Sequence, residues 1–371
     1  MPEDMLNIGD FDDILAEAPV QEAPIEDTAP HALKIGFIGA GQAGCNLANT
    51  FWDTCGYRRV ILFNTTGNDV RGSAVPEDLQ VIAEGFDGAG KNRDVGQRAA
   101  EQSATKLLAT MSRRFGSDTD YIIVLASGGG GTGSGAAVKL AEYGRQYLCS
   151  KGLSPEEAAK RVGFIIMLPT DSEGSVSKHN ALSLVDDVTN FGGSPVMYID
   201  NGRVSSLVKS TLGGWYSQAN TMIARLFDMF NFLASKDSSR QAFDPQDYRT
   251  VLSSGLVSVG LTRLNRYSND MDLANALQQN LKTSLLVDDV GLASGTHAAI
   301  IVLGDDSTLN EIPMTALDNV RTVISSLLGS GPSKPVTIHT GIYANKSPVI
   351  QVFSMLGGLS FPAPKRRKLG G

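Results

Sequence analysis

Four nearly unbroken apolar runs follow one another in the first half of the chain, at 33–40, 58–66, 120–127 and 161–169. Short runs without polar alternation are typical of strands covered on both faces, as in parallel sheets. Helical stretches separate these runs. The alternation predicts an α/β fold with a doubly wound parallel sheet, and ligands of such sheets bind at the carboxyl ends of the strands.

The second half of the chain has a different pattern. Apolar residues recur every three or four positions from Trp215 to Phe230, which predicts one long buried helix ending near Lys236. Beyond it, strands are predicted at 251–262, 296–304, 334–343 and 347–356, and helices at 272–285 and 313–328. These elements indicate a second, smaller α+β domain. The predicted divisions are a disordered arm at 1–32, a first domain at 33–210, a central helix at 211–236, a second domain at 237–360 and a basic tail at 361–371.

Composition narrows the class of protein. The 371 residues are 42% hydrophobic, enough for about two domains, and no run of roughly 18 apolar residues is present. The N-terminus is acidic where a signal peptide is basic, so we expect a soluble, cytoplasmic protein without a membrane span. Three cysteines and four histidines show no metal-ligand spacing, which argues against disulfides and zinc.

The first glycine-rich turn, GAGQAG at 39–44, lies directly between a predicted strand and a predicted helix. Glycines there let backbone amides approach an anion, and the helix N-terminus adds partial positive charge. The same spacing serves dinucleotide-binding folds, which usually carry an acid at the end of the second strand. That strand ends at Asn64 instead. A tight turn without a ligand remains an alternative.

The second glycine-rich turn carries six glycines in the eight positions 128–135. Each glycine costs about 1 kcal/mol of backbone entropy, so a turn with no function is an improbable alternative. Its amides and two hydroxyls are suited to a phosphate chain. The turn lacks the lysine of a P-loop, which indicates another class of nucleotide site.

The GGGTGSG string in this turn resembles the signature of the tubulin/FtsZ superfamily. The order of the other motifs agrees, and they look closer to FtsZ-like and CetZ-like proteins than to eukaryotic tubulin; phage- and plasmid-encoded relatives stay open. The resemblance covers about 33–360. It implies a GTPase domain, GTP or GDP with Mg²⁺, and self-association head to tail into a filament that hydrolyses GTP at the subunit interface.

The resemblance also assigns roles to single positions. Residues 85–93 resemble the loop that reaches the terminal phosphate, Glu173 the acid on the ribose, and Asn201 a contact to guanine. Tyr216 and Asn220, one turn apart, match a stacking ring and a second guanine contact. Core packing is the alternative for Tyr216, and a solvated loop acid for Glu173. The nucleotide-binding candidates are Gly41, Gln42, Ala43, Asn46, Asn64, Gly88, Ala89, Gly90, Lys91, Gly129, Gly130, Gly131, Thr132, Gly133, Ser134, Glu173, Asn201, Tyr216 and Asn220.

Asp244 and Asp247 follow the long helix, at the start of another predicted helix. Two acids so placed are ordinarily capping groups, and that alternative stays open. In FtsZ-like proteins the loop reads NxDxxD, and one subunit inserts it against the nucleotide of its neighbour. The resemblance therefore assigns the catalytic, water-positioning role to Asp244 and Asp247. Ala242 replaces the family's Asn, for which Gln241 or Gln246 is an alternative source of an amide.

Other positions depart from the family pattern. Ser177 stands where the family has an Arg, and Thr66 where FtsZ has an acid. Lys91 is a candidate cation near the last phosphate, with a solvated loop lysine as the alternative. No side chain is assigned as a metal ligand.

The two ends carry opposite charge. Residues 1–30 hold nine acidic groups and no Lys or Arg, whereas the end holds Lys365, Arg366, Arg367 and Lys368. A solubilising tail is the simplest interpretation of that end. An acidic partner is the functional alternative, with the two ends tuning filament contacts; no nucleic-acid motif is evident. A non-polymerising nucleotide-binding regulator and, with less support, an NAD-dependent oxidoreductase remain alternatives for the whole chain.

Overall fold

The computed structural model describes residues 26–208, 214–282, 284 and 291–370, so residues 1–25 of the arm predicted at 1–32 lie outside these ranges. The chain folds into two compact units. Unit 1 holds residues 26–29, 33–169 and 173–193 of the described chain, and unit 2 holds 30–32, 170–172 and the described residues from 194 onwards. Each unit contains five neighbouring strands of the described strand order.

The sheet of unit 1 is parallel, with strand order β3-β2-β1-β4-β5. Its central strand places Ile38 opposite Ile61 on one side and Val124 on the other. All four predicted strands are confirmed; the short β3 is an addition. The strands are β1 Ile35–Ala40, β2 Val60–Asn64, β3 Gln80–Ile82, β4 Tyr121–Ser127 and β5 Val162–Leu168.

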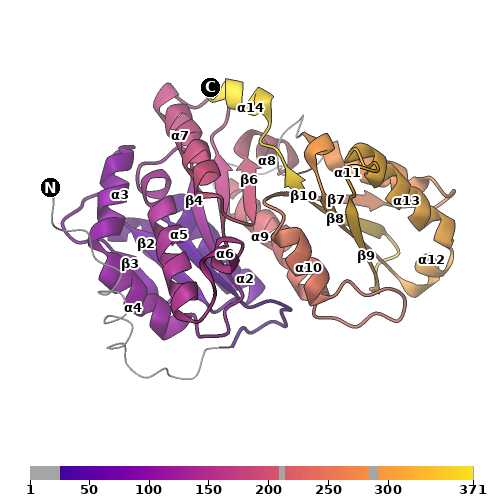
Figure 1. Ribbon diagram of the computed structural model, residues 1–371, viewed down its shortest axis with the longest axis horizontal. Helices are drawn as coiled ribbons and strands as arrows, with labels where there is room; N and C mark the ends of the chain where they lie inside the picture. The colour runs from indigo at the N-terminus through magenta and orange to yellow at the C-terminus, as the bar shows by residue number, and fades with distance from the viewer. Residues whose placement is uncertain (1–25, 209–213, 283, 285–290, 371) are drawn as a thin grey trace. The chain divides into compact units, whose positions relative to one another are not determined.

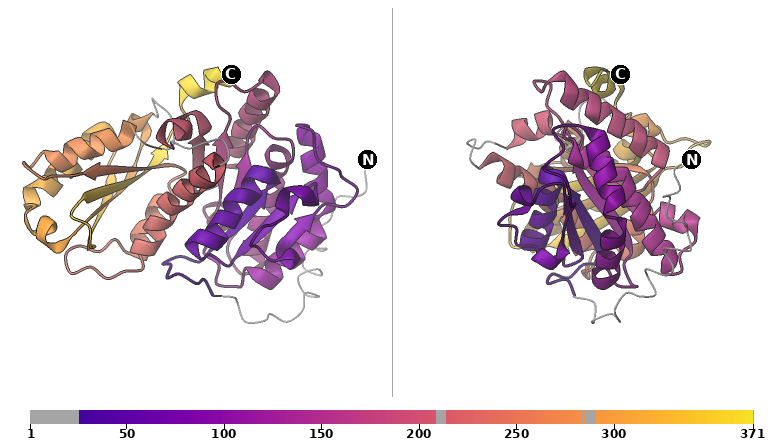
Figure 2. Two further views of the ribbon diagram at one scale, coloured as in Figure 1. Left: turned by 180° about the vertical axis from the view of Figure 1, so that it is seen from behind. Right: turned by 90° about the vertical axis from the view of Figure 1, so that its left-hand side faces the viewer.

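Helices cover both faces of this sheet, as doubly wound topology requires. The views in Figures 1 and 2 show α2 on one face and α4 and α5 on the other. On the α2 side, Phe37 and Phe51 stack with ring centroids 4.1 Å apart. The helices of unit 1 are α2 Gly41–Cys55, α3 Arg93–Gln102, α4 Ala104–Arg114, α5 Thr132–Ser150, α6 Pro155–Ala159 and α7 Ser175–Phe191, with short 3-10 helices η1 Gly67–Val70 and η2 Glu77–Leu79.

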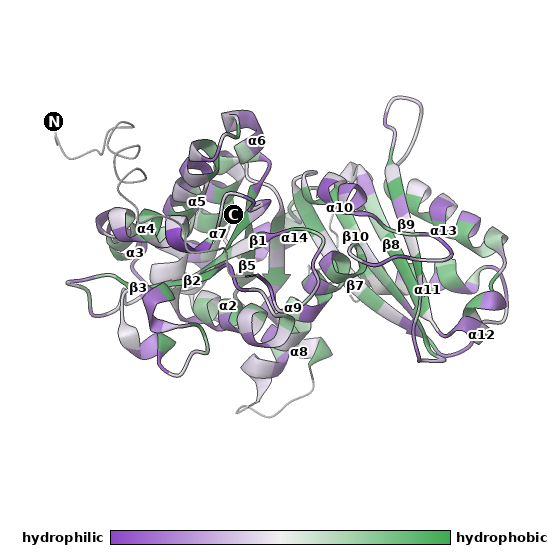
Figure 3. Ribbon diagram, turned by 90° about the horizontal axis from the view of Figure 1, so that it is seen from below, coloured by the Kyte–Doolittle hydropathy of each residue, from purple (hydrophilic) through white to green (hydrophobic). Residues whose placement is uncertain are grey.

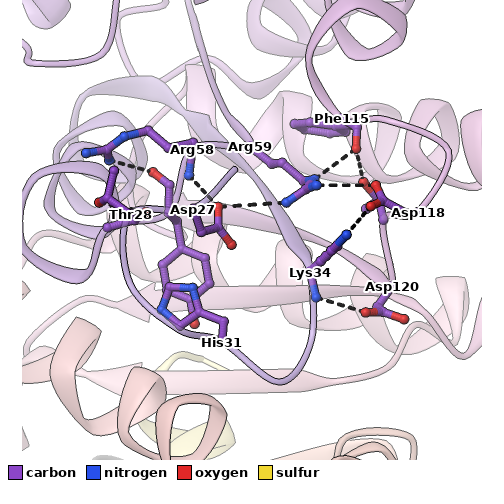
Figure 4. Close-up of polar contacts among 12 residues, drawn as sticks. Asp27, Thr28, His31, Lys34, Arg58, Arg59, Phe115, Asp118 and Asp120 are labelled. Carbon is purple, nitrogen blue, oxygen red and sulfur yellow. Dashed lines mark hydrogen bonds and ion pairs between the residues drawn. The ribbon is translucent and has the colours of Figure 1, made fainter. Parts of the chain in front are cut away.

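The ordered chain begins before the predicted Leu33. Asp27 accepts a hydrogen bond of 2.8 Å from the Arg58 amide, and its carboxylate lies 3.8 Å from the buried guanidinium of Arg59 (Figure 4). Arg59 also donates to Asp118 at 3.2 Å. The last acid of the arm is therefore part of unit 1. The predicted disordered boundary is wrong here because it was based on the lack of apolar periodicity, whereas Asp27 is held by charge.

The sheet of unit 2 is mixed, with order β6-β7-β10-β8-β9. β10 is antiparallel to β7 and β8, whereas β8 and β9 are parallel. The predicted strand at 251–262 starts too early, because Tyr248, Val251 and Leu252 are the buried face of a helix. The strands are β6 Val196–Asp200, β7 Leu256–Leu264, β8 His297–Gly304, β9 Thr337–Ala344 and β10 Ile350–Leu359.

The predicted long helix is confirmed as α9 Trp215–Leu233. Helices α11 and α13 pack on β8 and β10 through an aliphatic cluster that includes Leu277, Ile300 and Ile324; Figure 3 shows the strands of this sheet as largely hydrophobic. The remaining helices are α8 Asn201–Leu207, α10 Pro245–Leu252, α11 Asp272–Lys282, α12 Asp306–Asn310, α13 Met314–Leu327 and α14 Ala363–Lys368, with the 3-10 helix η3 Leu292–Ser294. Within the described ranges, no helix is long and apolar enough to cross a membrane.

Candidate functional site

Three glycine-bearing turns meet at the carboxyl edge of the unit 1 sheet. A Cβ atom at Gly41 would lie 2.9 Å from the amide nitrogen of Gly133, so the turns after β1 and β4 touch. A Cβ at Gly131 would lie 2.7 Å from the amide nitrogen of Asn92, which brings in the turn after β3. Glycine is required at both positions because backbone approaches backbone too closely for any side chain.

The three turns enclose a cavity of about 360 Å³, called here the unit 1 cavity. Because α2 and α5 both begin at its wall, the N-terminal amides and dipoles of two helices favour an anion there. The predicted residues that line it are Gly41, Gln42, Ala43, Gly88, Ala89, Gly90, Lys91, Gly130, Gly131, Thr132 and Gly133, and Ala40, Asp69 and Ser127 line it in addition.

Eight predicted residues do not line this cavity, and four of them belong to the walls or to α2: Asn46, Asn64, Gly129 and Ser134. Asn46 is exposed on α2, and Gly129 lies one residue outside the lining. The Asn64 side chain is fully buried, donating to Asp69 at 3.1 Å and accepting from the Thr65 amide at 2.8 Å. The Ser134 hydroxyl donates to the Gly130 carbonyl oxygen. Both polar side chains are therefore used to hold the walls.

Asp69 is the carboxylate among the residues that line the cavity, and the sequence analysis did not identify it. Thr66 caps the 3-10 helix η1 by accepting from the Asn68 amide at 3.3 Å, and that turn carries Asp69 to the wall. Thr66 occupies the position where an acid was expected. The acid is supplied three residues later, and only the path of η1 shows this.

Lys91 is exposed, and both its ammonium and its backbone have hydrogen-bond partners. Its ammonium donates to the Ser177 hydroxyl at 2.8 Å, and the Asn180 amide donates to its carbonyl oxygen at 2.8 Å. Its φ is 62°, a left-handed conformation that is uncommon for a residue with a side chain. A cation from this turn therefore stands at the serine that replaces the expected arginine.

Glu173 lies beside the second glycine-rich turn. A Cβ atom at Gly129 would lie 3.5 Å from Glu173 Oε2 and 3.2 Å from Ser177 Cβ. Glu173 is half-buried, so the alternative of a fully solvated loop acid does not describe it. Neither Gly129 nor Glu173 lines the unit 1 cavity, although Gly130, the next residue of the turn, does.

The predicted base contacts belong to unit 2. Tyr216 is 70% exposed at the start of α9, so core packing is wrong for this ring. It meets Trp215 edge to face, with centroids 4.9 Å apart. Asn220 follows one turn later and is half-buried, and Asn201 is the first residue of α8. All three residues are at least partly exposed.

Asp244 and Asp247 form a capping box at the start of α10. Asp244 Oδ1 accepts from the Asp247 amide at 2.8 Å, and Asp247 Oδ2 accepts from the Asp244 amide at 3.3 Å. This arrangement satisfies two backbone donors at the helix start. Residues 244–247 are called the acid turn below. The capping alternative stated for these acids is confirmed as a structural role, and their catalytic role stays a prediction.

His339 is a neighbour of the acid turn that the sequence analysis missed. Its Nδ1 lies 2.6 Å from Asp247 Oδ1, and it comes from β9, which follows α10 by many residues. Tyr343 on the same strand anchors the turn, because its hydroxyl accepts from the Phe243 amide at 2.8 Å. Gln241, a candidate for the missing amide, pairs with Ile342 through its backbone, and its side-chain Oε1 accepts from Arg321 at 3.4 Å.

The basic end of the chain is a helix, α14, and its first lysine is buried. Lys365 Nζ lies 2.6 Å from Asp200 Oδ2 and 3.6 Å from Asp171 Oδ1. Lys368 donates to Asp171, and this hydrogen bond lowers the pKa of the Asp171 carboxyl. A loose solubilising tail is therefore wrong for Lys365, whereas Lys368 remains an exposed base. Among the described residues, no cluster of three His, Cys, Asp or Glu side chains is arranged to hold a metal ion.

Comparison with known proteins agrees with this architecture. Residues 34–209 match the family described as Tubulin/FtsZ family, GTPase domain. The chain is 26% identical to the tubulin-like protein TubZ of Bacillus cereus, covering 92% of this chain and 82% of that protein. It is 24% identical to the tubulin-like protein CetZ2 of Haloferax volcanii, covering 88% and 89%.

A solved protofilament structure of TubZ from Bacillus thuringiensis serovar israelensis, in a GTPγS form, has the same fold. It aligns with a TM-score of 0.77 at 17% identity and covers 91% of each chain. The parallel strands and the glycine-rich turns of unit 1 all lie within the residues that match the family. Residues 34–209 therefore belong to the tubulin/FtsZ family, as its GTPase domain.

Proposed function

We propose that the chain binds GTP with its phosphates in the unit 1 cavity, polymerises head to tail, and hydrolyses GTP where successive subunits meet. The matching family model describes a GTPase domain. One relative is a tubulin-like protein, and a structure with the same fold is a protofilament. The observation that carries the proposal is a cavity walled by backbone from three glycine-bearing turns. Such walls suit an extended anion and offer little to a neutral ligand.

The charged lining fits a phosphate chain with its cation. Lys91 supplies positive charge from the left-handed turn, and its hydrogen bond to Ser177 holds it across the second glycine-rich turn. Asp69 is the lining group able to take an oxygen position on Mg²⁺, which would offset charge on the phosphates. Lys91 would therefore contact the terminal phosphate, and Asp69 would contact the cation.

Base and sugar recognition is assigned to the remaining predicted residues. Glu173 is the acceptor for ribose hydroxyls, Tyr216 offers an exposed ring for stacking, and Asn201 and Asn220 present amides to the edge of guanine. The Tyr216 ring exposes apolar surface to solvent, and a stacked base would cover that surface. A purine with a hydrogen-bonding edge is the ligand that matches both groups.

The acid turn is proposed to act in trans, on the nucleotide of the next subunit. Asp244 uses one carboxylate oxygen for the capping box, which leaves its second oxygen to orient the attacking water. Asp247 is held by the Asp244 amide and by His339. Proton acceptance and water positioning are the contributions required from such carboxylates in phosphoryl transfer.

A non-polymerising nucleotide-binding protein is the second candidate, and the capping box favours it. Because helix capping alone accounts for both acids, their presence is no argument for hydrolysis in trans. The oxidoreductase alternative loses its support, since residues 34–209 match the GTPase domain of the tubulin/FtsZ family.

The test is the GTPase rate per subunit as a function of protein concentration with Mg²⁺. The proposal predicts a rate that climbs above a threshold concentration and falls by about 100-fold in Asp247→Asn, which keeps a capping oxygen. Asp237→Asn, at an exposed acid, is the matched control and keeps the wild-type curve. A rate per subunit independent of concentration identifies the non-polymerising alternative.

Mixing two inactive variants tests the division of the site between subunits. Gly130→Val places a side chain in the cavity wall where its Cβ meets no protein atom within 4 Å, so it blocks phosphate without straining the fold. Subunits with Gly130→Val retain the acid turn, and subunits with Asp247→Asn retain the cavity. The mixture recovers activity if hydrolysis occurs in trans, and stays inactive if both groups act within one chain.

A further inference from the structure

The charges of α14 have partners in unit 2 at two carboxylates, Asp200 and Asp171, that come shortly before predicted nucleotide contacts in the chain. The Lys365 side chain is only 2% exposed and lies between Asp200, at 2.6 Å, and Asp171, at 3.6 Å. Lys368 contacts the other oxygen of Asp171 at 3.0 Å. A buried ammonium requires carboxylate partners, so these contacts are built into the fold.

Asp200 connects Lys365 to the helix that starts with Asn201. Its Oδ1 accepts from the amides of Gly202 at 2.7 Å and Arg203 at 3.4 Å, while its Oδ2 faces Lys365. The carboxylate is 4% exposed. One side chain therefore caps α8 and neutralises the lysine, and the direction of Asn201 depends on that cap.

Asp171 connects the same lysine to the predicted ribose segment. It lies two residues before Glu173 in the chain, and both Lys365 and Lys368 hold its carboxylate. The exposure of Asp171 is 57%, so Lys365 is the buried end of this contact. Segments that are far apart in sequence are thus tied to one lysine near the C-terminus.

Apolar packing fixes α14 in place. Leu369 is 3% exposed, and the Phe361 ring meets Tyr198 of β6 edge to face with centroids 4.9 Å apart. Because both ends of the basic segment are packed, Lys365 is positioned by the core of unit 2 and not by a surface ion pair alone.

We propose that Lys365 is a positioning residue for nucleotide recognition, holding Asp200 and Asp171 so that Asn201 and Glu173 meet the base and the ribose. The inference rests on the proposed GTP binding. It assigns the basic C-terminal helix to the base and sugar end of the ligand, where the sequence had suggested a tail for an acidic partner. Lys365 does not touch the ligand; it acts through two carboxylates.

The test compares Lys365→Gln with Arg367→Gln, a neighbouring exposed base on the same helix, in the full chain. Equilibrium binding is measured for GTP, ATP and inorganic triphosphate. We expect Lys365→Gln to weaken GTP binding by about tenfold and to narrow the preference for GTP over ATP, with triphosphate binding unchanged. Arg367→Gln stays within about twofold of the wild type.

A rescue variant and a nucleotide-free measurement separate positioning from loss of folding. Adding Asp200→Asn to Lys365→Gln replaces the ion pair with a neutral pair that still caps α8, so GTP affinity is expected to return to within about threefold. Without nucleotide, hydrogen exchange at the amides of Gly202 and Arg203 is faster in Lys365→Gln and normal in the double variant.

Three results would overturn the inference: unchanged GTP affinity and unchanged exchange in Lys365→Gln, equal losses for GTP, ATP and triphosphate, or no rescue by Asp200→Asn. The proposed function itself is contradicted if the wild-type chain binds no GTP, and this is measured on the unmodified protein. The two failures are therefore distinguished by the first binding curve.

Discussion

The unit 1 cavity and the acid turn are both predicted from short motifs, yet they are built in opposite ways. The cavity is made of backbone, and its glycines are required because a Cβ at Gly41 or Gly131 would meet another turn. The acid turn is made of side chains, and Asp244 and Asp247 already satisfy a helix start. Glycines in this number have few uses, whereas carboxylates at a helix start have a common structural one.

We expect the largest effect at Asp244, where the capping role and the catalytic role can be separated. Asp244→Ser keeps an N-cap acceptor but removes the carboxylate, so we expect the GTPase rate to fall by about 100-fold while the free energy of unfolding changes by less than about 0.5 kcal/mol. Single-turnover hydrolysis and urea unfolding measure the two quantities. Asp244→Ala loses the cap as well and costs about 1 kcal/mol. A serine variant with the wild-type rate would reduce Asp244 to a capping group.

A second prediction tests the backbone construction of the cavity. Gly131→Ala places a Cβ 2.7 Å from the Asn92 amide nitrogen and 2.8 Å from Ala89 Cβ, so the turns must move apart. We expect unfolding to become easier by about 2 kcal/mol, with loss of GTP binding. Gly130→Ala, whose Cβ meets nothing within 4 Å, is the matched control and changes stability by less than about 0.5 kcal/mol. Equal urea midpoints for the two variants would contradict close contact of the turns.

Lys91 contributes a charged side chain to a cavity that is otherwise built largely from backbone. Lys91→Gly removes the cation and relieves a left-handed backbone, so stability stays within about 1 kcal/mol. We expect the preference for GTP over GDP to fall by about tenfold, measured by competition binding. Lys91→Asn tolerates the same φ without the charge and is expected to match the glycine variant. Retained preference in both would place the terminal phosphate away from Lys91.

The smallest effect concerns pH. Because the hydrogen bond from Lys368 lowers the pKa of Asp171, this carboxylate stabilises the folded chain at neutral pH, and the contribution is lost as pH falls below the ordinary carboxyl range. Asp171 is exposed, so the contribution is at most a few tenths of a kcal/mol. Asp171→Asn should lower the urea midpoint slightly at pH 7 and not at pH 3. The same loss at both pH values would show that charge is not the cause.

The patterns that repeat along the chain predicted the fold. The apolar runs of unit 1 became β1, β2, β4 and β5, and the stripe from Trp215 to Phe230 became α9. The predicted start of β7 at Val251 was wrong, because an apolar pair that ends a short helix cannot be told from the start of a strand by periodicity alone. The arm boundary was wrong because Asp27 is held by the charge of Arg59.

The sequence by itself determined the parallel sheet, the three glycine-bearing turns and the family, because each is encoded by residues close together in the chain. Only the tertiary structure decided which side chains surround them. Asp69 reaches the cavity through the path of η1, His339 meets Asp247 from β9, and Lys365 pairs with Asp200 from the far end of the chain. Such partners are chosen by long-range packing and by the need of a buried charge for a counter-charge, neither of which leaves a local pattern.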